Sequence, residues 1–261
     1  MTDDGPGSDP AYDAVRRDGV LRITRPDTEW LSTGWNGGRE RADCVYNVSV
    51  PDDWERTDLE QYVDDRLERA GFGGDDSGPA LLTGVDIEDA RGARCGPVTA
   101  YATAGISNPA ALPMDPEGKP DAEGDSLPGR VSTLEAGTVN VVVGTTRALA
   151  PGALANLVAV AAEAKAATLL AETGFPGTTT DAVVVGHDPA GESVEFTGSA
   201  TEVGAATRAC VREAVRASLQ AHYDDGEFSL PESVDDASYG VSTDVRAAVF
   251  QPSVESVPNE R

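Results

Sequence analysis

Residues 138–186, TVNVVVGTTRALAPGALANLVAVAAEAKAATLLAETGFPGTTTDAVVVG, contain the pattern that decides the fold. The apolar runs Thr138-Val-Asn-Val-Val-Val143 and Asp181-Ala-Val-Val-Val-Gly186 predict two strands, the second of a buried type. Between them Pro151 to Thr173 predicts a long helix, because proline suits the first helical turn and Gly174 suits the C-terminal stop. Its alanine-rich sequence would let this helix pack closely against a sheet.

The flanking sequence adds further elements on both sides of this unit. Short alternating or apolar runs predict strands at 19–24, 43–50, 80–84 and 98–103. Helices are predicted at 57–70 and 203–222, the latter preceded by a possible capping box at Ser199-Ala-Thr-Glu202. Together the elements predict an α/β fold, with mixed α+β as the alternative: a single domain with a mixed sheet and packed helices.

The chain divides into a central domain and two acidic ends. We expect a mobile N-terminal tail at 1–17, the domain at 18–223, and an acidic C-terminal tail at 224–261 in which Val245 to Phe250 could dock. The Pro-, Gly- and Asp-rich stretch 112–135 reads as a surface insertion, which is tolerated because loop-closure entropy grows slowly with length.

The charge balance excludes some partners. Asp and Glu total 45 against 20 Lys and Arg, giving a net charge of −25. Nucleic acid and anionic lipid both need cationic neutralisation, so we expect neither as a partner. High net charge that salt screens is typical of a protein from a salt-rich cytoplasm.

The cysteines and the hydropathy also indicate a cytoplasmic protein. Cys44, Cys95 and Cys210 form no CxxC pair, and their odd number with no signal peptide suggests a reduced compartment. We expect no membrane span, which needs about 20 consecutive apolar residues. The sequence does not indicate the oligomeric state.

Lysine is nearly absent from the chain, and one of its two copies stands out. Lys165 shares a helix face with Val158, Ala161 and Leu169, so it must be paired or reach solvent. Burial would lower its pKa and make it a base or an amide-polarising cation, and the alternative is a structural salt bridge. Glu163 lies about 200° away on the helix and is a candidate general acid or base, or simply a solvated side chain.

Two loop motifs carry groups suited to ligand binding. In Ser32 to Gly38, Trp35 offers a flat apolar face and Asn36 offers both donor and acceptor, although the motif also fits a decorated turn. In Thr103 to Pro109, Asn108 stands at the end of a strand, where an Asn-Pro turn is the alternative.

Two further motifs lie at the starts of the central strands. Asn140 interrupts an apolar run and needs hydrogen-bond partners if it is buried. Thr178, Thr179, Thr180 and Asp181 bring hydroxyls and a carboxylate together, either as site groups or as strand capping. The Gly137–Thr138 step is also a possible self-cleavage point that would free an N-terminal threonine nucleophile.

The two histidines do not suggest a site. His187 precedes Asp188-Pro189 without a Gly-x-Ser-x-Gly elbow, and His222 ends a helix, where a cation is favourable. No cluster has metal-ligand spacing, so we expect no metal site.

Taken together, these segments resemble the adenosylcobinamide amidohydrolase family. The matching stretches follow the family's order and cover most of residues 20–222: 32–38, 103–108, 137–143, 149–154 with Glu163-Ala-Lys165, 179–185 and 197–204. The acidic tails and the 112–135 insertion depart from the family's pattern and look like adaptation to salt.

The resemblance implies hydrolysis of the amide that joins the aminopropanol arm to the corrin ring, giving adenosylcobyric acid and 1-aminopropan-2-ol. The small-molecule corrinoid is then the partner, and no cofactor is expected, since the cobalt belongs to the substrate. The candidate catalytic residues are Glu163 or Asp181 to activate water and Lys165 to hold the oxyanion, a role that Asn36 could share. The candidate substrate-binding residues are Trp35, Asn36, Asn108, Asn140, Thr179 and Thr180. A corrinoid-binding carrier without catalysis is the rival interpretation.

Overall fold

The computed structural model describes residues 11–51, 58–74, 78–116, 138–224, 226, 229–237 and 239–253. The elements before the central unit are β1 (Asp13–Arg17), β2 (Val20–Ser32), β3 (Gly38–Ser49), α1 (Leu59–Arg69), β4 (Ala80–Thr83), the 3-10 helix η1 (Ile87–Asp89), β5 (Arg91–Cys95), β6 (Val98–Ala104) and β7 (Ala110–Ala111). The remaining elements are β8 (Val139–Thr145), β9 (Ala148–Leu149), α2 (Pro151–Thr173), β10 (Ala182–His187), β11 (Ser193–Val194), α3 (Glu202–Tyr223), the 3-10 helix η2 (Val234–Asp236) and β12 (Val241–Ser242).

An eight-stranded mixed sheet with packed helices confirms the predicted α/β class. The strand order is β4-β3-β2-β10-β8-β6-β5, with β1 paired to β2. The quoted central unit forms the middle of this sheet, where β8 and β10 run parallel and their flanking neighbours β6 and β2 run antiparallel. The two valine-rich strands are buried along their whole length, as their continuous apolar runs indicate.

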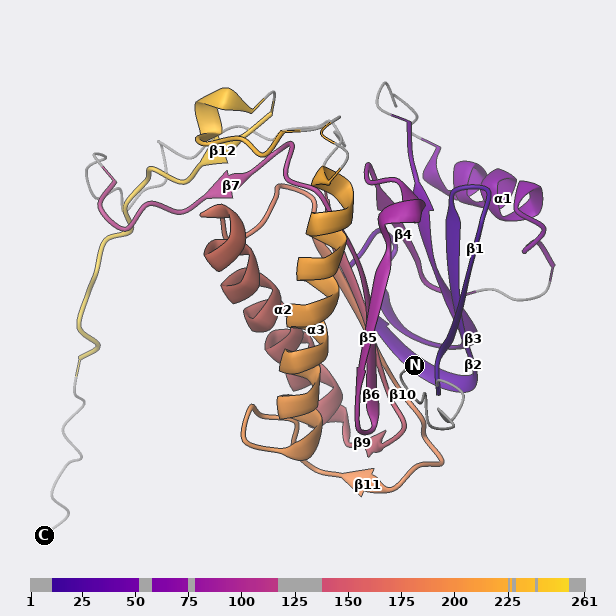
Figure 1. Ribbon diagram of the computed structural model, residues 1–261. Coiled ribbons are helices and arrows are strands. Elements are labelled where there is room, and N and C mark those ends of the chain that lie inside the picture. Colours follow the sequence, from indigo (N-terminus) through magenta and orange to yellow (C-terminus); the bar gives the residue numbers. More distant parts are fainter. Residues whose placement is uncertain are drawn as a thin grey trace, which may run out of the picture.

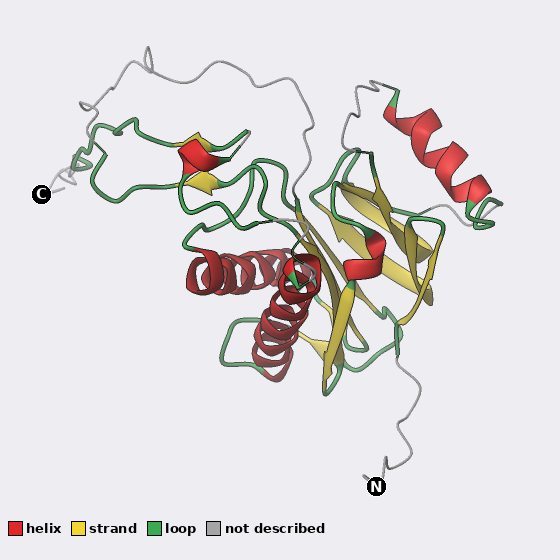
Figure 2. Cartoon of the chain, turned by 45° about the horizontal axis from the view of Figure 1, so that its top comes forward, coloured by secondary structure: helices red, strands yellow, loops and turns green. Residues whose placement is uncertain are grey.

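Helices α2 and α3 pack side by side over one face of the sheet (Figure 1). Alternate residues of β8 serve the two faces, because side chains in a strand alternate. Val141 and Val143 pack beneath the helices, whereas Val142 joins Tyr12 and Trp30 on the opposite face. Helix α1 stands apart from this pair, beside the far strands of the sheet (Figure 2).

Helix α2 matches its predicted bounds and ends at Gly174, whose φ of +81° is the left-handed conformation that glycine favours. By length and composition alone this helix is apolar enough to span a membrane, contrary to our expectation that no such segment exists. Half of it is buried within the fold, and it packs on α3 and β10, as the core helix of a folded domain does.

The predicted N-terminal tail is wrong for residues 11–17. Asp13–Arg17 form β1, which pairs antiparallel with β2, and Tyr12 is only 1% exposed in the core. Its hydroxyl donates to the Thr145 carbonyl oxygen at 2.9 Å, which ties this segment to the central strand β8. Residues 1–10 lie outside the described part of the chain.

The C-terminal region only partly matches the predicted tail. Val241–Ser242 form β12, which pairs with β7, while Val249 and Phe250 are 98% and 83% exposed and do not dock. The predicted insertion at 112–135 lies outside the described residues from 117 onward. The cap of α3 is Thr201, which accepts from the Gly204 N–H, and not the predicted Ser199.

Candidate functional site

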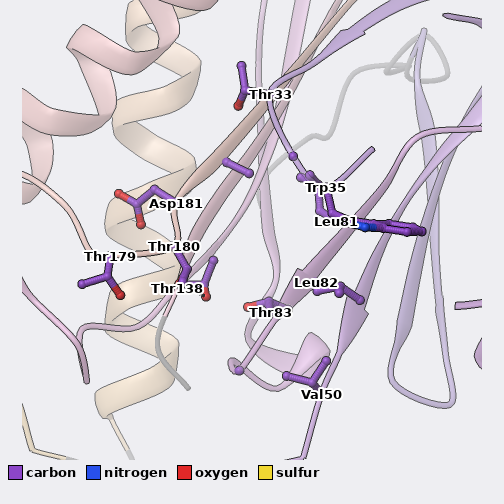
Figure 3. A pocket seen from close by; sticks show the side chains of 13 residues that line it. Thr33, Trp35, Val50, Leu81, Leu82, Thr83, Thr138, Thr179, Thr180 and Asp181 are labelled. Carbon is purple, nitrogen blue, oxygen red and sulfur yellow. Dashed lines mark hydrogen bonds between the residues drawn. The ribbon is translucent and has the colours of Figure 1, made fainter. Parts of the chain in front are cut away.

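A pocket of about 260 Å³ is lined by residues from the β2–β3 turn, the end of β4 and the segments that lead into β8 and β10. Asp181, Thr138, Thr179 and Thr180 lie on one side of it, and Trp35, Leu82 and Val50 lie on the other (Figure 3). The polar side chains that line it are Thr33, Thr83, Thr138, Thr179, Thr180 and Asp181. The predicted motifs at 32–38 and 177–182 therefore meet here, although about 150 residues separate them in the chain.

Asp181, which lines this pocket, forms an ion pair with Lys165. Lys165 extends from the interior of α2, is 7% exposed, and bonds Asp181 Oδ2 through its Nζ. Asp181 Oδ2 also accepts from the Thr178 N–H at 3.1 Å, and Oδ1 accepts from the Thr178 hydroxyl and from the Val139 N–H at 2.9 Å. Four donors thus occupy the roughly four lone pairs of this carboxylate, so the pair fixes the turn that enters β10.

Asn108 is fully buried and donates hydrogen bonds to two of the threonines that line the pocket. Its Nδ2 donates to Thr179 Oγ1 at 2.7 Å and to Thr180 Oγ1 at 3.4 Å. Thr180 Oγ1 lies 2.9 Å from Thr138 Oγ1, so the hydroxyls just before β8 and just before β10 meet in the pocket. Asn108 does not line the pocket, and its action on a ligand would therefore be indirect.

Asn140 is also buried and lies in a hydrogen-bond chain within the sheet. The Leu82 carbonyl oxygen can only accept, so the Asn140 atom 2.8 Å from it must be Nδ2. The second hydrogen of that amide goes to Asn47 Oδ1 at 3.0 Å, which leaves Asn47 Nδ2 to donate to Thr103 Oγ1 at 2.9 Å. The backbone carbonyl therefore fixes the orientation of both amides.

The same chain ends at a hydroxyl on the pocket wall. Thr103 Oγ1 accepts from Asn47 and donates to Thr83 Oγ1 at 3.4 Å. Thr83 Oγ1 also accepts from the Val85 N–H at 3.1 Å, and its own hydrogen has no acceptor among the described residues. Thr83 is thus left with a donor for a ligand, and its oxygen faces Thr138 in Figure 3. Asn47 and Thr83 were not predicted, although each is a polar residue within an apolar strand.

Trp35 and Asn36 are adjacent in the turn between β2 and β3 but differ in the pockets that they line. Trp35 is 40% exposed and lines both this pocket and a neighbouring one of about 470 Å³. Asn36, with φ +50°, lines only the neighbouring pocket, whose rim carries the carboxylates of Glu40 and Asp64. Because Asn36 does not line the pocket that contains Asp181, it is not placed to share the oxyanion role predicted from the sequence.

Glu163 does not reach the pocket, which corrects its proposed catalytic role. Its side chain is 64% exposed on the outer face of α2 and lies 3.5 Å from an Arg208 nitrogen on α3. The solvated alternative holds, because two residues along a helix turn the side chain to another face.

The histidines have structural partners away from the pocket. His187 accepts from the Leu149 N–H through Nδ1 at 3.0 Å, and its Nε2 lies 2.9 Å from a Glu29 oxygen. His222 pairs with Asp89 at 2.9 Å. Across the described ranges, no group of three or more His, Cys, Asp or Glu side chains is arranged to hold a metal ion.

Comparisons with known proteins relate this chain to one enzyme family. The pattern of the family described as adenosylcobinamide amidohydrolase matches residues 6–227. An adenosylcobinamide amidohydrolase of Halobacterium salinarum is 59% identical over 243 residues, covering 92% of this chain and all of the relative. The enzyme of the same name from Methanosarcina mazei is 29% identical over 76% of this chain and 93% of its own length. Among solved structures, the PH0078 protein of Pyrococcus horikoshii matches with a TM-score of 0.37 and 13% identity over 78% of each chain.

Proposed function

Because the chain belongs to the adenosylcobinamide amidohydrolase family, we propose that it cleaves the amide between the aminopropanol arm and the corrin ring. The products would be adenosylcobyric acid and 1-aminopropan-2-ol, so that scavenged cobinamide returns to coenzyme B12 synthesis. The acidic composition and a relative from Halobacterium salinarum support action in a salt-rich cytoplasm.

The observation that carries this proposal is the size and lining of the threonine-rich pocket. Its volume of about 260 Å³ is below the roughly 300–1,000 Å³ of pockets that enclose a drug-sized ligand. It suits a short side arm ending in an amide and a hydroxyl, but not a corrin ring. The ring would rest at the mouth, where Trp35 offers an exposed aromatic face.

Hydroxyl donors in the pocket would stabilise the oxyanion of the tetrahedral intermediate. Thr83 has a hydroxyl hydrogen that no described residue accepts. Preorganised donors of this kind stabilise charge that develops in the transition state without reorganisation during the reaction. We assign the oxyanion contact to Thr83, and the binding of the arm to Thr179 and Thr180.

Lys165 and Asp181 would act by positioning rather than as proton carriers. The donors around Asp181 occupy its lone pairs and join α2, the 178–181 turn and the start of β8. Asn108 and Asn140 would position the threonines in the same indirect way. Asn36 would meet the corrin amides in the neighbouring pocket, next to Trp35.

Aminopropanol release is the test of this function. Purified protein is mixed with adenosylcobinamide in molar potassium chloride, and free 1-aminopropan-2-ol is measured over time. We expect many turnovers per protein molecule. Stoichiometric binding of the corrinoid without release would instead support a non-catalytic carrier. In a carrier, the same Trp and Asn side chains would bind the corrinoid without cleaving it.

A further inference from the structure

The pocket has two chemically different sides, and the arm proposed to enter it carries two different groups that match them. 1-Aminopropan-2-ol has a hydroxyl and a methyl group on the same carbon atom, next to the carbon that bears the amide nitrogen. Thr138, Thr179 and Thr180 lie on one side of the pocket, and Val50 and Leu82 lie on the other (Figure 3). A methyl group is stabilised against an apolar wall, whereas a hydroxyl group is destabilised there unless it finds a hydrogen-bond partner.

We propose that the apolar side, formed by Val50 and Leu82, recognises the methyl group of the arm and makes hydrolysis selective for a methyl-bearing amino alcohol of one configuration. This inference rests on the proposed function, because the arm enters the pocket only if its amide is the bond that is cleaved. The hydroxyl group of the arm would face the threonines, and its methyl group would face Val50 and Leu82.

Val50 and Leu82 are held side by side by the pairing of β3 with β4. Val48 and Leu82 are partners in this parallel pair, and Val50 follows Val48 by two residues, so Val50 and Leu82 project to the same face of the sheet. The Val50 N–H donates to the Thr83 carbonyl oxygen at 2.8 Å, just beyond the end of β3. Both side chains are partly buried against the apolar cluster that contains Tyr46, and both line the pocket. A methyl group would therefore meet a wall whose position is fixed by the sheet.

The opposite side offers a hydroxyl group to the arm. Thr179 Oγ1 accepts from Asn108 Nδ2 at 2.7 Å, and its own hydrogen has no acceptor among the described residues. The hydroxyls of Thr138 and Thr180 lie 2.9 Å apart and bond each other. Thr179 is therefore the hydroxyl on this side that is best placed to meet the arm. Gly137, which forms the possible self-cleavage point with Thr138, lies outside the described residues, so that cleavage stays a prediction.

Thr83 lies between the two sides and supplies a third point of contact. Its oxygen faces Thr138, and Leu82 precedes it in β4 (Figure 3). With the amide oxygen at Thr83, the hydroxyl group at Thr179 and the methyl group at Leu82, three groups of the arm are placed at once. An arm of the opposite configuration can make two of these contacts but not all three. Either its methyl group leaves the apolar side, or its hydroxyl group is left without a partner there.

The test compares substrates that differ in the arm alone. The first is adenosylcobinamide, the second is the analogue made with 2-aminoethanol, which lacks the methyl group, and the third carries the arm of the opposite configuration. One methylene group in a hydrophobic pocket changes kcat/KM by about 10-fold to 200-fold, so the aminoethanol arm should be released at least about 10-fold less efficiently. The two configurations should also differ in kcat/KM.

The outcomes separate this inference from the proposed function. Equal kcat/KM values for the methyl-bearing and methyl-free arms, or for the two configurations, would overturn the inference and leave the proposed function standing. Release of no amino alcohol from any of the three substrates would overturn both.

Leu82→Ala tests the apolar side directly. It should lower the ratio of kcat/KM between the aminopropanol and aminoethanol arms by about 4-fold or more, the effect of at least one buried methylene group. A ratio measured on one protein sample does not depend on how much of that sample is folded. The same variant should raise kcat/KM for a 1-aminobutan-2-ol arm relative to the aminopropanol arm, because the extra methylene group fills the space left by the leucine. An unchanged ratio in both comparisons would contradict the assignment.

Leu230→Ala is the matched control. Leu230 is also a partly buried leucine, but it packs against the cluster beneath α2 and α3 and lines a different pocket. The same loss of side-chain atoms should therefore leave both ratios at the values of the unchanged chain. A shift in the control equal to that in Leu82→Ala would show that the selectivity does not come from the apolar side of this pocket.

Discussion

Thr83 presents its hydroxyl hydrogen to the pocket because the groups around it fix the order of donors and acceptors. Thr83→Val should therefore lower kcat by about 100-fold, the usual effect of losing one oxyanion donor, with little change in KM. Thr83→Ser restores the hydroxyl and should recover most of the rate. Equal kcat values for the Val and Ser variants would remove Thr83 from the oxyanion site.

The Lys165–Asp181 pair gives a second prediction at this scale. Asp181→Asn leaves a buried ammonium without its partner and should lower the free energy of unfolding by about 3 kcal/mol. Lys165→Met combined with Asp181→Asn removes both charges and should regain much of that loss. Denaturant unfolding in potassium chloride measures both variants.

Glu163→Gln is the matched control, two residues from Lys165 on the same helix. It should change neither stability nor turnover, because Glu163 faces solvent and Arg208. If the variant that combines Lys165→Met with Asp181→Asn is no more stable than Asp181→Asn alone, the stabilities contributed by the two charges do not depend on each other.

Lys165 and Asp181 stand out in the sequence because each breaks a pattern: a lysine on an apolar helix face, and an acid at the start of a buried strand. Their pairing was not predictable, since 16 residues and a turn separate them. For Glu163 the sequence left a general acid or base and a solvated side chain as alternatives, and its 64% exposure beside Arg208 favours the second. The donor order at Thr83 depends on contacts between four strands, which no local pattern encodes.

At the scale of elements, the glycines of the central strands make room for aromatic rings. A Cβ on Gly186 of β10 would lie 2.3 Å from the buried Trp30 ring. Gly186→Ala should therefore destabilise the protein by about 1–3 kcal/mol, the typical cost of overpacking a core. Gly152 of α2 has open space around it, so Gly152→Ala should stabilise by up to about 1 kcal/mol. Thermal unfolding of both variants measures the difference, and a neutral Gly186→Ala would contradict the packing.

The elements with a strong single pattern were predicted well. The bounds of α2 are as predicted, and β8 and β10 begin one residue later than their apolar runs. β1 and β5 were missed, because their sequences DAVRR and RGARC are mostly polar and exposed. Their strand conformation comes from pairing with β2 and β6, a tertiary effect that overrides local preference.

At the scale of the whole molecule, the partly buried carboxylates of Glu29 and Asp188 should make the free energy of unfolding depend on pH in the acidic range. Burial acts to raise the pKa of Glu29, but hydrogen bonds and charges from Arg39 and His187 outweigh it and lower the pKa. The pKa of Asp188 is also lowered, because burial acts to raise it but the hydrogen bonds from Arg25 and from the Ala190 N–H outweigh burial. A lowered folded-state pKa contributes stability above the unfolded value and loses it as pH falls toward the folded value.

The free energy of unfolding should therefore be constant near neutral pH and decline below the ordinary carboxyl values of 4.5 and 3.8. Arg25→Gln with Arg39→Gln should make that decline shallower. Unfolding curves in potassium chloride between neutral and acidic pH measure it. An equally steep decline in the double variant would show that these two pairs do not set the acid response.

The order of the predicted strands and helices indicated the α/β class, and the composition indicated an acidic surface. The position of the pocket could be located only once the fold was known. Segments 32–38, 80–84, 138–140 and 178–182 meet only in the folded chain, where the β2–β3 turn, the end of β4 and the starts of β8 and β10 border one pocket. The sequence order of these motifs was visible, and their convergence was not.

The central claim is that this pocket hydrolyses the aminopropanol amide. The most direct measurement follows adenosylcobyric acid and 1-aminopropan-2-ol together, in molar potassium chloride, with the unchanged chain beside Glu163→Gln and Thr83→Val. We predict equal amounts of the two products over many turnovers, retained by Glu163→Gln and strongly reduced by Thr83→Val. Tight binding of adenosylcobinamide with neither product formed would contradict the claim.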